Sequence, residues 1–231
     1  MNSFDLDILH FLNQFAHQSR MLDGMMGAMA SQALFKGWFM VPLFWWAWFT
    51  PGKANSVNRE IVVATLASAV LAVVVGRLLA DYLPFRTRPL QTPEVGFVLP
   101  YGAAADSLRS WSSFPSDHAM VFFAMSTGLW YVSRTLGAGS TLYVACIIAL
   151  PRVYMGYHYP TDIIGGALFG ILFAYVANLE RVRSRLAAPA MKWLDVHPAS
   201  FYTCFFLFSQ GLATLFDPIR KLATFLRSLI G

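Results

Sequence analysis

The sequence predicts an all-α protein, a polytopic helix bundle embedded in a membrane. Only 13% of its 231 residues are charged and 57% are hydrophobic. A soluble domain carries roughly 25% charged residues, so this chain has too few to cover a water-exposed surface. The mean hydropathy of +0.52 agrees. The apolar residues gather in segments near the ~20 residues that a spanning helix needs, without the strict alternation of membrane strands.

About six of these segments are predicted to span the membrane within one domain that covers 1–231. They are residues 34–50, 61–83, 118–133, 141–157, 163–179 and 201–216. In the fifth segment, Gly165, Gly166 and Gly170 permit a close contact with another helix.

Both ends of the chain are predicted to form interfacial helices. Residues 4–16, within the N-terminal region 1–32, place apolar side chains near helical spacing with Asp5 and Asp7 between them. This pattern fits a helix in the membrane interface, or equally a short helix packed on the bundle. The tail at 217–231 is also amphipathic.

No functional role is expected for the two cysteines or for three of the histidines. Cys146 and Cys204 lie within predicted spans and are expected to be small buried hydrophobes. Three histidines have no evident partner in the sequence and are expected to face solvent: His10, His17 and His197.

The charge distribution predicts an orientation. Lys and Arg accumulate on the cytoplasmic side of membrane proteins, and residues 180–198 form the most basic connection. Counting spans back from there places the connection at 84–115 outside. This long polar connection contains five prolines and is predicted to be the active-site loop. The aromatic residues are not interleaved with basic ones, so no nucleic-acid partner is expected.

Three short polar segments are predicted to meet at the outer membrane face. They are Arg86 to Pro89, Phe114 to His118, and Arg152 to Asp162. Arginine presents a planar fork of donors that matches phosphate oxygens. Ser116 opens a predicted helix, whose free N–H groups and dipole also favour an anion.

The histidines in these segments fit phosphoryl transfer. His158 and Asp162 are four residues apart, a spacing at which the carboxylate can orient the imidazole for attack on phosphorus. His118 is then available to protonate the leaving group. Because arginines and a helix dipole supply positive charge, neither a metal nor another cofactor is expected.

These segments resemble the signatures of the type 2 phosphatidic acid phosphatase superfamily. Arg152, His158 and Asp162 fit R-x5-H-x3-D, Pro115 to His118 fit P-S-G/D-H, and Arg88-Pro89 fit the end of K-x6-R-P. All three occur in the family's order and spacing.

The resemblance implies a role for each matching residue. His158 is the nucleophile, Asp162 its orienting partner and His118 the general acid. Phosphate is bound by Arg88 and Arg152, with help from Ser116 and the backbone amide of Asp117.

This chain departs from the family at two positions. Asp81 stands where the first signature has lysine, and Pro151 where a serine usually precedes the third-signature arginine. One phosphate contact is therefore missing, or it is supplied by Arg77, which shares a helix face with Asp81, or by Arg86.

The compact size and the stretch F-P-S-D-H-A resemble bacterial undecaprenyl-diphosphatases. The implied activity is hydrolysis of a polyprenyl diphosphate to its monophosphate, through a phosphohistidine, at the outer face of a bacterial inner membrane. The alternatives are a phosphatidate, phosphatidylglycerophosphate or lipid A phosphatase or phosphotransferase. An alternative from another functional class is a protein without catalytic activity that binds or transports a phospholipid. Asp81, in place of the family lysine, is compatible with it. The superfamily also contains haloperoxidases, which are soluble proteins. The charged content of 13% excludes a soluble protein of this kind.

Overall fold

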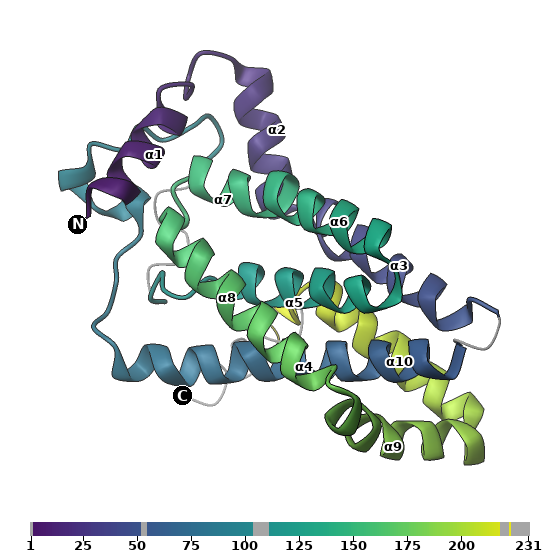
Figure 1. Cartoon of the computed structure of the whole chain (residues 1–231). Helices are drawn as coiled ribbons and strands as arrows, with labels where there is room; N and C mark the ends of the chain where they lie inside the picture. The colour runs from purple at the N-terminus through teal and green to yellow at the C-terminus, as the bar shows by residue number, and fades with distance from the viewer. Residues whose placement is uncertain (1, 52–54, 104–110, 218–221, 223–231) are drawn as a thin grey trace.

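The computed structural model describes residues 2–51, 55–103, 111–217 and 222, which form helices and loops without a strand (Figure 1). The α-helices are α1 Ser3–Asn13, α2 Arg20–Ser31, α3 Gly37–Phe49, α4 Asn55–Tyr82, α5 Asp117–Val132, α6 Arg134–Tyr143, α7 Leu150–Tyr154, α8 Pro160–Ala177, α9 Glu180–Val196 and α10 Pro198–Ala213. Short helical segments are η1 Ala33–Phe35, η2 Pro89–Gln91, η3 Pro93–Val95 and the π-helical η4 Val144–Ala149. The all-α prediction is confirmed.

Three helical stretches among the described residues are long and apolar enough to cross a membrane. They are α4, the continuous stretch Arg134–Tyr154 and α8, with mean hydropathies of 2.3, 1.5 and 1.6 over their most apolar windows. The predicted segments 34–50, 118–133 and 201–216 are also helical, as α3, α5 and α10, but these helices have only 13, 16 and 16 residues. The six predicted segments are therefore largely helical, but the prediction that all six span the membrane is not confirmed.

Helix α5 lies in the middle of the bundle, between α4, α6 and α8 (Figure 1). Phe122, Met125 and Leu129 on this helix are completely buried. A helix that is apolar on all sides is typical of the interior of a bundle. The central position of α5 brings its N-terminus to the place where the polar segments meet.

Glycines allow α8 to lie directly on α5. A Cβ atom on Gly170 would be 2.1 Å from the carbonyl oxygen of Met120, and one on Gly166 would be 2.5 Å from that of Ser116. Only a residue without a side chain permits backbones to approach so closely. The close helix contact predicted from the glycine pattern is therefore confirmed.

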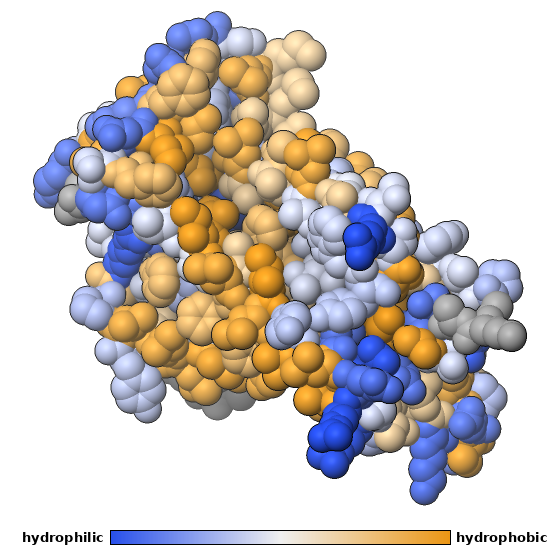
Figure 2. Space-filling model, viewed as in Figure 1, coloured by the Kyte–Doolittle hydropathy of each residue, from blue (hydrophilic) through white to orange (hydrophobic). Residues whose placement is uncertain are grey.

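The surface has an apolar band between two more polar ends (Figure 2). One polar end carries α1 and the loops around it, and the other carries α9, where Arg181 and Arg185 are exposed. The stretch 180–198, expected to be a basic connection, is helical over most of its length, and Arg183 pairs with Glu60 on α4 at 3.3 Å. This pattern is that of a helix bundle in a bilayer.

Helix α1 packs on the bundle. It contacts α7 and α8, and its Leu9 is completely buried. Phe4 and Phe11 are exposed, so the helix also carries an apolar outer surface. The packed alternative is therefore correct for α1, and its position in the membrane interface stays a prediction. The predicted tail helix at 217–231 lies outside the described residues, apart from Asp217 and Leu222.

The expectation for the cysteines is wrong. Cys146 on η4 and Cys204 on α10 are both exposed. The prediction treated a position within an apolar segment as a buried one, but a bundle in lipid exposes apolar side chains on its outer surface.

Adding one methyl group at the α5–α8 contact is expected to destabilise the protein. Gly170→Ala places a Cβ against the backbone of Met120, where overpacking costs about 1–3 kcal/mol. Gly139→Ala on α6 is the matched control, because a Cβ there meets nothing within 4 Å. Thermal unfolding of the purified proteins in detergent should show a lower midpoint for Gly170→Ala only. Equal midpoints for the two variants would mean that the contact is not close.

Candidate active site

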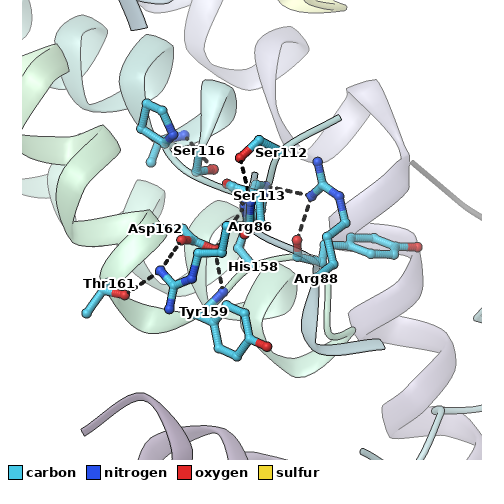
Figure 3. Close-up of polar contacts among 12 residues, drawn as sticks. Arg86, Arg88, Ser112, Ser113, Ser116, His158, Tyr159, Thr161 and Asp162 are labelled. Carbon is cyan, nitrogen blue, oxygen red and sulfur yellow. Dashed lines mark hydrogen bonds and ion pairs between the residues drawn. The ribbon is translucent and has the colours of Figure 1, made fainter. Parts of the chain in front are cut away.

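The three polar segments predicted from the sequence do meet at one end of the bundle (Figure 3). Arg88 follows α4, Ser116 precedes α5, Arg152 lies in α7 and His158 lies in the loop before α8. The α5–α8 contact draws two of these segments together, since the backbone N–H of Ser116 donates to the carbonyl of Asp162 at 3.1 Å. The site therefore depends on helix packing that brings distant residues together.

His158 is buried with its two ring nitrogens in different surroundings. Its Nδ1 lies 2.9 Å from the carbonyl oxygen of Ser113, and its Nε2 lies 3.5 Å from Nη1 of Arg88. A carbonyl can only accept and a guanidinium can only donate. This network assigns the proton to Nδ1 and leaves the lone pair on Nε2, the ring nitrogen that faces Arg88.

Asp162 contacts the imidazole less closely than predicted. Its Oδ2 lies 3.7 Å from Nδ1 of His158, whereas the Ser113 carbonyl is at hydrogen-bond distance. Oδ2 instead accepts the backbone N–H of Tyr159 at 2.8 Å, at the N-terminus of α8. The expected Asp162–His158 hydrogen bond is therefore absent in this resting geometry, and Ser113 orients the ring. Asp162 supplies a nearby negative charge.

Burial controls the protonation of His158. It lowers the pKa of the imidazole to about 4, because the charged form loses its hydration. Asp162 opposes this shift, while the positive charges of Arg88 and Arg152 add to it. The neutral, nucleophilic form therefore predominates at neutral pH.

Arg88 and Arg152 are buried and are held by backbone carbonyls. Nη1 of Arg88 donates to the Tyr157 carbonyl at 2.6 Å, and Nη2 of Arg152 donates to the Ala30 carbonyl at 3.0 Å. Burial lowers the pKa of Arg88 to about 10, which still leaves it charged at neutral pH. The buried Nε of Arg152 has no hydrogen-bond partner among the described residues. Both arginines are thus placed to attract an anion.

Ser116 and His118 lie at the beginning of α5. Ser116 is completely buried and caps the helix, with its Oγ 3.5 Å from the backbone N of Ala119. His118 lies in the first turn, partly buried, with its ring 6.2 Å from that of Phe122. An anion beside this helix N-terminus would be stabilised by the free N–H groups.

Arg77 and Asp117 pair with each other. Nε of Arg77 lies 2.7 Å from Oδ1 of Asp117, and its Nη2 donates to the Pro115 carbonyl. Asp81, which shares a face of α4 with Arg77, is exposed. Asp117 was expected to act through its backbone, but its carboxylate neutralises Arg77. In this arrangement Arg77 holds the loop before α5.

Arg86, the other residue predicted to replace the family lysine, is also engaged by carboxylates. It donates to Asp162 at 2.5 Å (Figure 3) and to Asp5 at 2.6 Å. Figure 3 shows its guanidinium on a different side of His158 from that of Arg88. The structure therefore places Arg86 behind the His158–Asp162 pair and not beside Nε2.

Several residues around the site were missed or misjudged from the sequence. Asp5 is completely buried, and its partners lie 81 and 156 residues away along the chain. His10, His17 and His197 are exposed, as expected, but the rings of His10 and His17 have partners, 2.8 and 2.6 Å away, in the carbonyls of Val95 and Leu99. The only signal was a set of polar residues on an otherwise apolar N-terminal helix. These polar side chains attach α1 to the loop that follows α4.

Comparison with known proteins identifies the family. The model of the PAP2 superfamily matches residues 61–184, which is more than half of the chain. The protein belongs to the PAP2 superfamily. It is therefore a phosphatase of a membrane family, and the resemblance seen in the three signatures is confirmed.

The relatives have low identity over most of their length. The bacitracin transport permease protein BcrC of Bacillus licheniformis is 24% identical over 75% of this chain and 78% of its own. The lipid A 1-diphosphate synthase of Escherichia coli is 28% identical over 73% and 72%, and the undecaprenyl-diphosphatase BcrC of Bacillus subtilis is 22% identical over 74% and 80%. No solved structure matches the chain.

The protonation of His158 can be measured directly. In protein labelled with 13C at the histidine Cε1 atoms, the His158 resonance should titrate near pH 4, because burial disfavours the imidazolium. The His158→Gln variant assigns the resonance by its loss. A midpoint near the ordinary value of about 6.5 would contradict the buried, neutral nucleophile.

Proposed function

We propose that this PAP2 phosphatase hydrolyses a polyprenyl diphosphate, such as undecaprenyl diphosphate, to its monophosphate. The observation that carries the proposal is the placement of His158 Nε2 beside the Arg88 guanidinium, 3.5 Å away, in a buried site. A nucleophile that faces a positive charge is suited to an anionic phosphorus centre. The choice of a diphosphate is supported by the relative named undecaprenyl-diphosphatase and by the F-P-S-D-H-A stretch.

The proposed reaction has two steps. His158 Nε2 attacks the terminal phosphorus and the bond to the bridging oxygen breaks, while His118 donates a proton to the leaving lipid monophosphate. Water then attacks the phosphohistidine, with His118 accepting its proton, and inorganic phosphate leaves. Arg88 and Arg152 stabilise the charge that develops on the phosphoryl oxygens, and Asp162 stabilises the imidazolium. The site as proposed uses no metal, and activity is expected to survive excess chelator.

A cavity next to the site supports a lipid substrate. It measures about 240 Å³ and its mostly apolar walls come from α4, α5 and the region after α10. Arg77, Asp117 and Trp111 also line it. Asp117 is adjacent in sequence to Ser116 and to His118, the proposed general acid, so the cavity opens beside the N-terminus of α5, where the phosphate end of the lipid is proposed to lie.

A panel of substrates tests the proposed activity. Purified protein should release phosphate from undecaprenyl diphosphate faster than from phosphatidate, phosphatidylglycerophosphate or lipid A. His158→Ala should abolish release, because no neighbouring group replaces the imidazole. His197→Ala, at an exposed position, is the control.

Each other outcome has a defined meaning. Faster release from another lipid would transfer the assignment to that substrate class. More than a tenth of wild-type activity in His158→Ala would remove His158 as nucleophile. Release from none of the four lipids would favour a lipid-binding protein.

The active site is proposed to face the outside of the bacterial inner membrane. In a variant lacking Cys146 and Cys204, a cysteine at Gly102 should react with an impermeant thiol reagent in intact cells. A cysteine at Ser184 in α9 should react only after the membrane is permeabilised, because the basic end is predicted to be cytoplasmic. The reverse labelling would place the active site inside.

A further inference from the structure

Asp5 on α1 is a buried carboxylate that no part of the proposed reaction uses. It is completely buried, and it accepts from Nη2 of Arg86 at 2.6 Å, from the backbone N of Thr161 at 2.8 Å and from the Thr161 hydroxyl at 2.7 Å. A buried charge is costly unless it is paired and hydrogen-bonded. These three bonds satisfy that need and attach the N-terminal helix to the first turn of α8.

Arg86 connects Asp5 to Asp162. Its Nη1 donates to Oδ1 of Asp162 at 2.5 Å while its Nη2 donates to Asp5, and its guanidinium lies over the Tyr159 ring, 4.2 Å from the centroid (Figure 3). The planar fork of arginine suits such a double contact. The guanidinium therefore has a fixed position between two acids.

This bridge determines how Asp162 faces His158. Arg86 donates to Oδ1 of Asp162, and the Tyr159 backbone N–H donates to Oδ2. Oδ2 itself lies 3.7 Å from Nδ1 of His158. The other charged groups near His158 are Arg88 and Arg152, both positive. Asp162 is thus the carboxylate next to the ring among the described residues, and Arg86 neutralises part of its charge.

We propose that Asp5 and Arg86 are positioning residues for the phosphatase reaction, with Asp5 balancing Arg86 so that Asp162 keeps negative charge available to His158. The proposal rests on the function proposed above, in which His158 becomes a positively charged phosphohistidine. Asp162 is the group that stabilises that charge. Without Asp5, the charge of Arg86 falls on Asp162 alone, and the imidazolium loses stabilisation. The N-terminal helix is then part of the catalytic unit.

Kinetics with undecaprenyl diphosphate test the role of Asp5. Asp5→Asn should lower kcat about 10- to 100-fold, as loss of an outer carboxylate does elsewhere, with KM changed less than twofold. Asp7→Asn, an exposed acid on the same helix, is the matched control and should match wild type. A kcat within twofold of wild type in folded Asp5→Asn would overturn the proposal.

The two residues should also act as one unit. The double variant Asp5→Asn/Arg86→Gln should lose no more activity than the worse single variant, because the second change removes the charge that the first leaves unbalanced. Independent, multiplicative losses would contradict the proposal. If Asp5→Asn does not fold, Thr161→Val removes the hydroxyl that donates to Asp5 and accepts from Arg86, with little change of shape. It should lower kcat several-fold, and an unchanged kcat would count against the proposal.

A measurement without substrate separates this proposal from the proposed function. Arg86→Gln leaves Asp162 with its full charge, so the 13C resonance of His158 should titrate above the wild-type value of about 4. An unchanged midpoint would mean that Arg86 does not act on the dyad. A raised midpoint in a protein that cleaves no lipid in the panel would leave the Arg86–Asp162 coupling intact and reject the proposed activity.

Discussion

The contact between α5 and α8 is the constraint on which the site depends. Gly166 and Gly170 bring the two backbones so close that any side chain there would overlap with the carbonyls of Ser116 and Met120. At the end of this contact the Ser116 N–H reaches the Asp162 carbonyl. The N-termini of both helices therefore lie together, with His118 in the first turn of α5 and His158 just before α8. If the two helices packed less closely, the same residues would be present but would not lie together in one site.

The four arginines near the site differ in their hydrogen-bond and ion-pair partners. Arg77 and Arg86 are paired with carboxylates, those of Asp117, Asp5 and Asp162, and fix loops and helix ends. Arg88 and Arg152 also donate to backbone carbonyls, which orient each guanidinium. In a buried site, where water screens charge little, the Arg88 guanidinium acts strongly on Nε2 of His158, 3.5 Å away. The same burial keeps His158 neutral at neutral pH.

Sequence reasoning predicted the parts of the site that depend on local spacing. The helix start at Ser116, the glycines of α8 and the proximity of Asp162 to His158 could all be predicted from local spacing, although the hydrogen bond expected between those two residues is absent. Asp5 could not, because a lone acid on an amphipathic helix looks like part of its polar side, and its partner Thr161 is 156 residues away. The Ser113 carbonyl carries no side-chain signature at all. Arg77 shares a helix face with Asp81, but its carboxylate partner is Asp117 on α5, which spacing along one helix could not reveal. The number of spans also depends on which helices lie within the bundle, which hydropathy alone does not reveal.

The central claim is that His158 Nε2 takes up the phosphoryl group. Rapid-quench experiments with undecaprenyl diphosphate labelled with 32P on its terminal phosphate test it most directly. We expect a transient protein-bound label that is stable in alkali and lost in acid, as phosphohistidine is, located on His158 and absent from His158→Ala. Release of labelled phosphate in the first turnover with no protein-bound label, or a label on another residue, would contradict it.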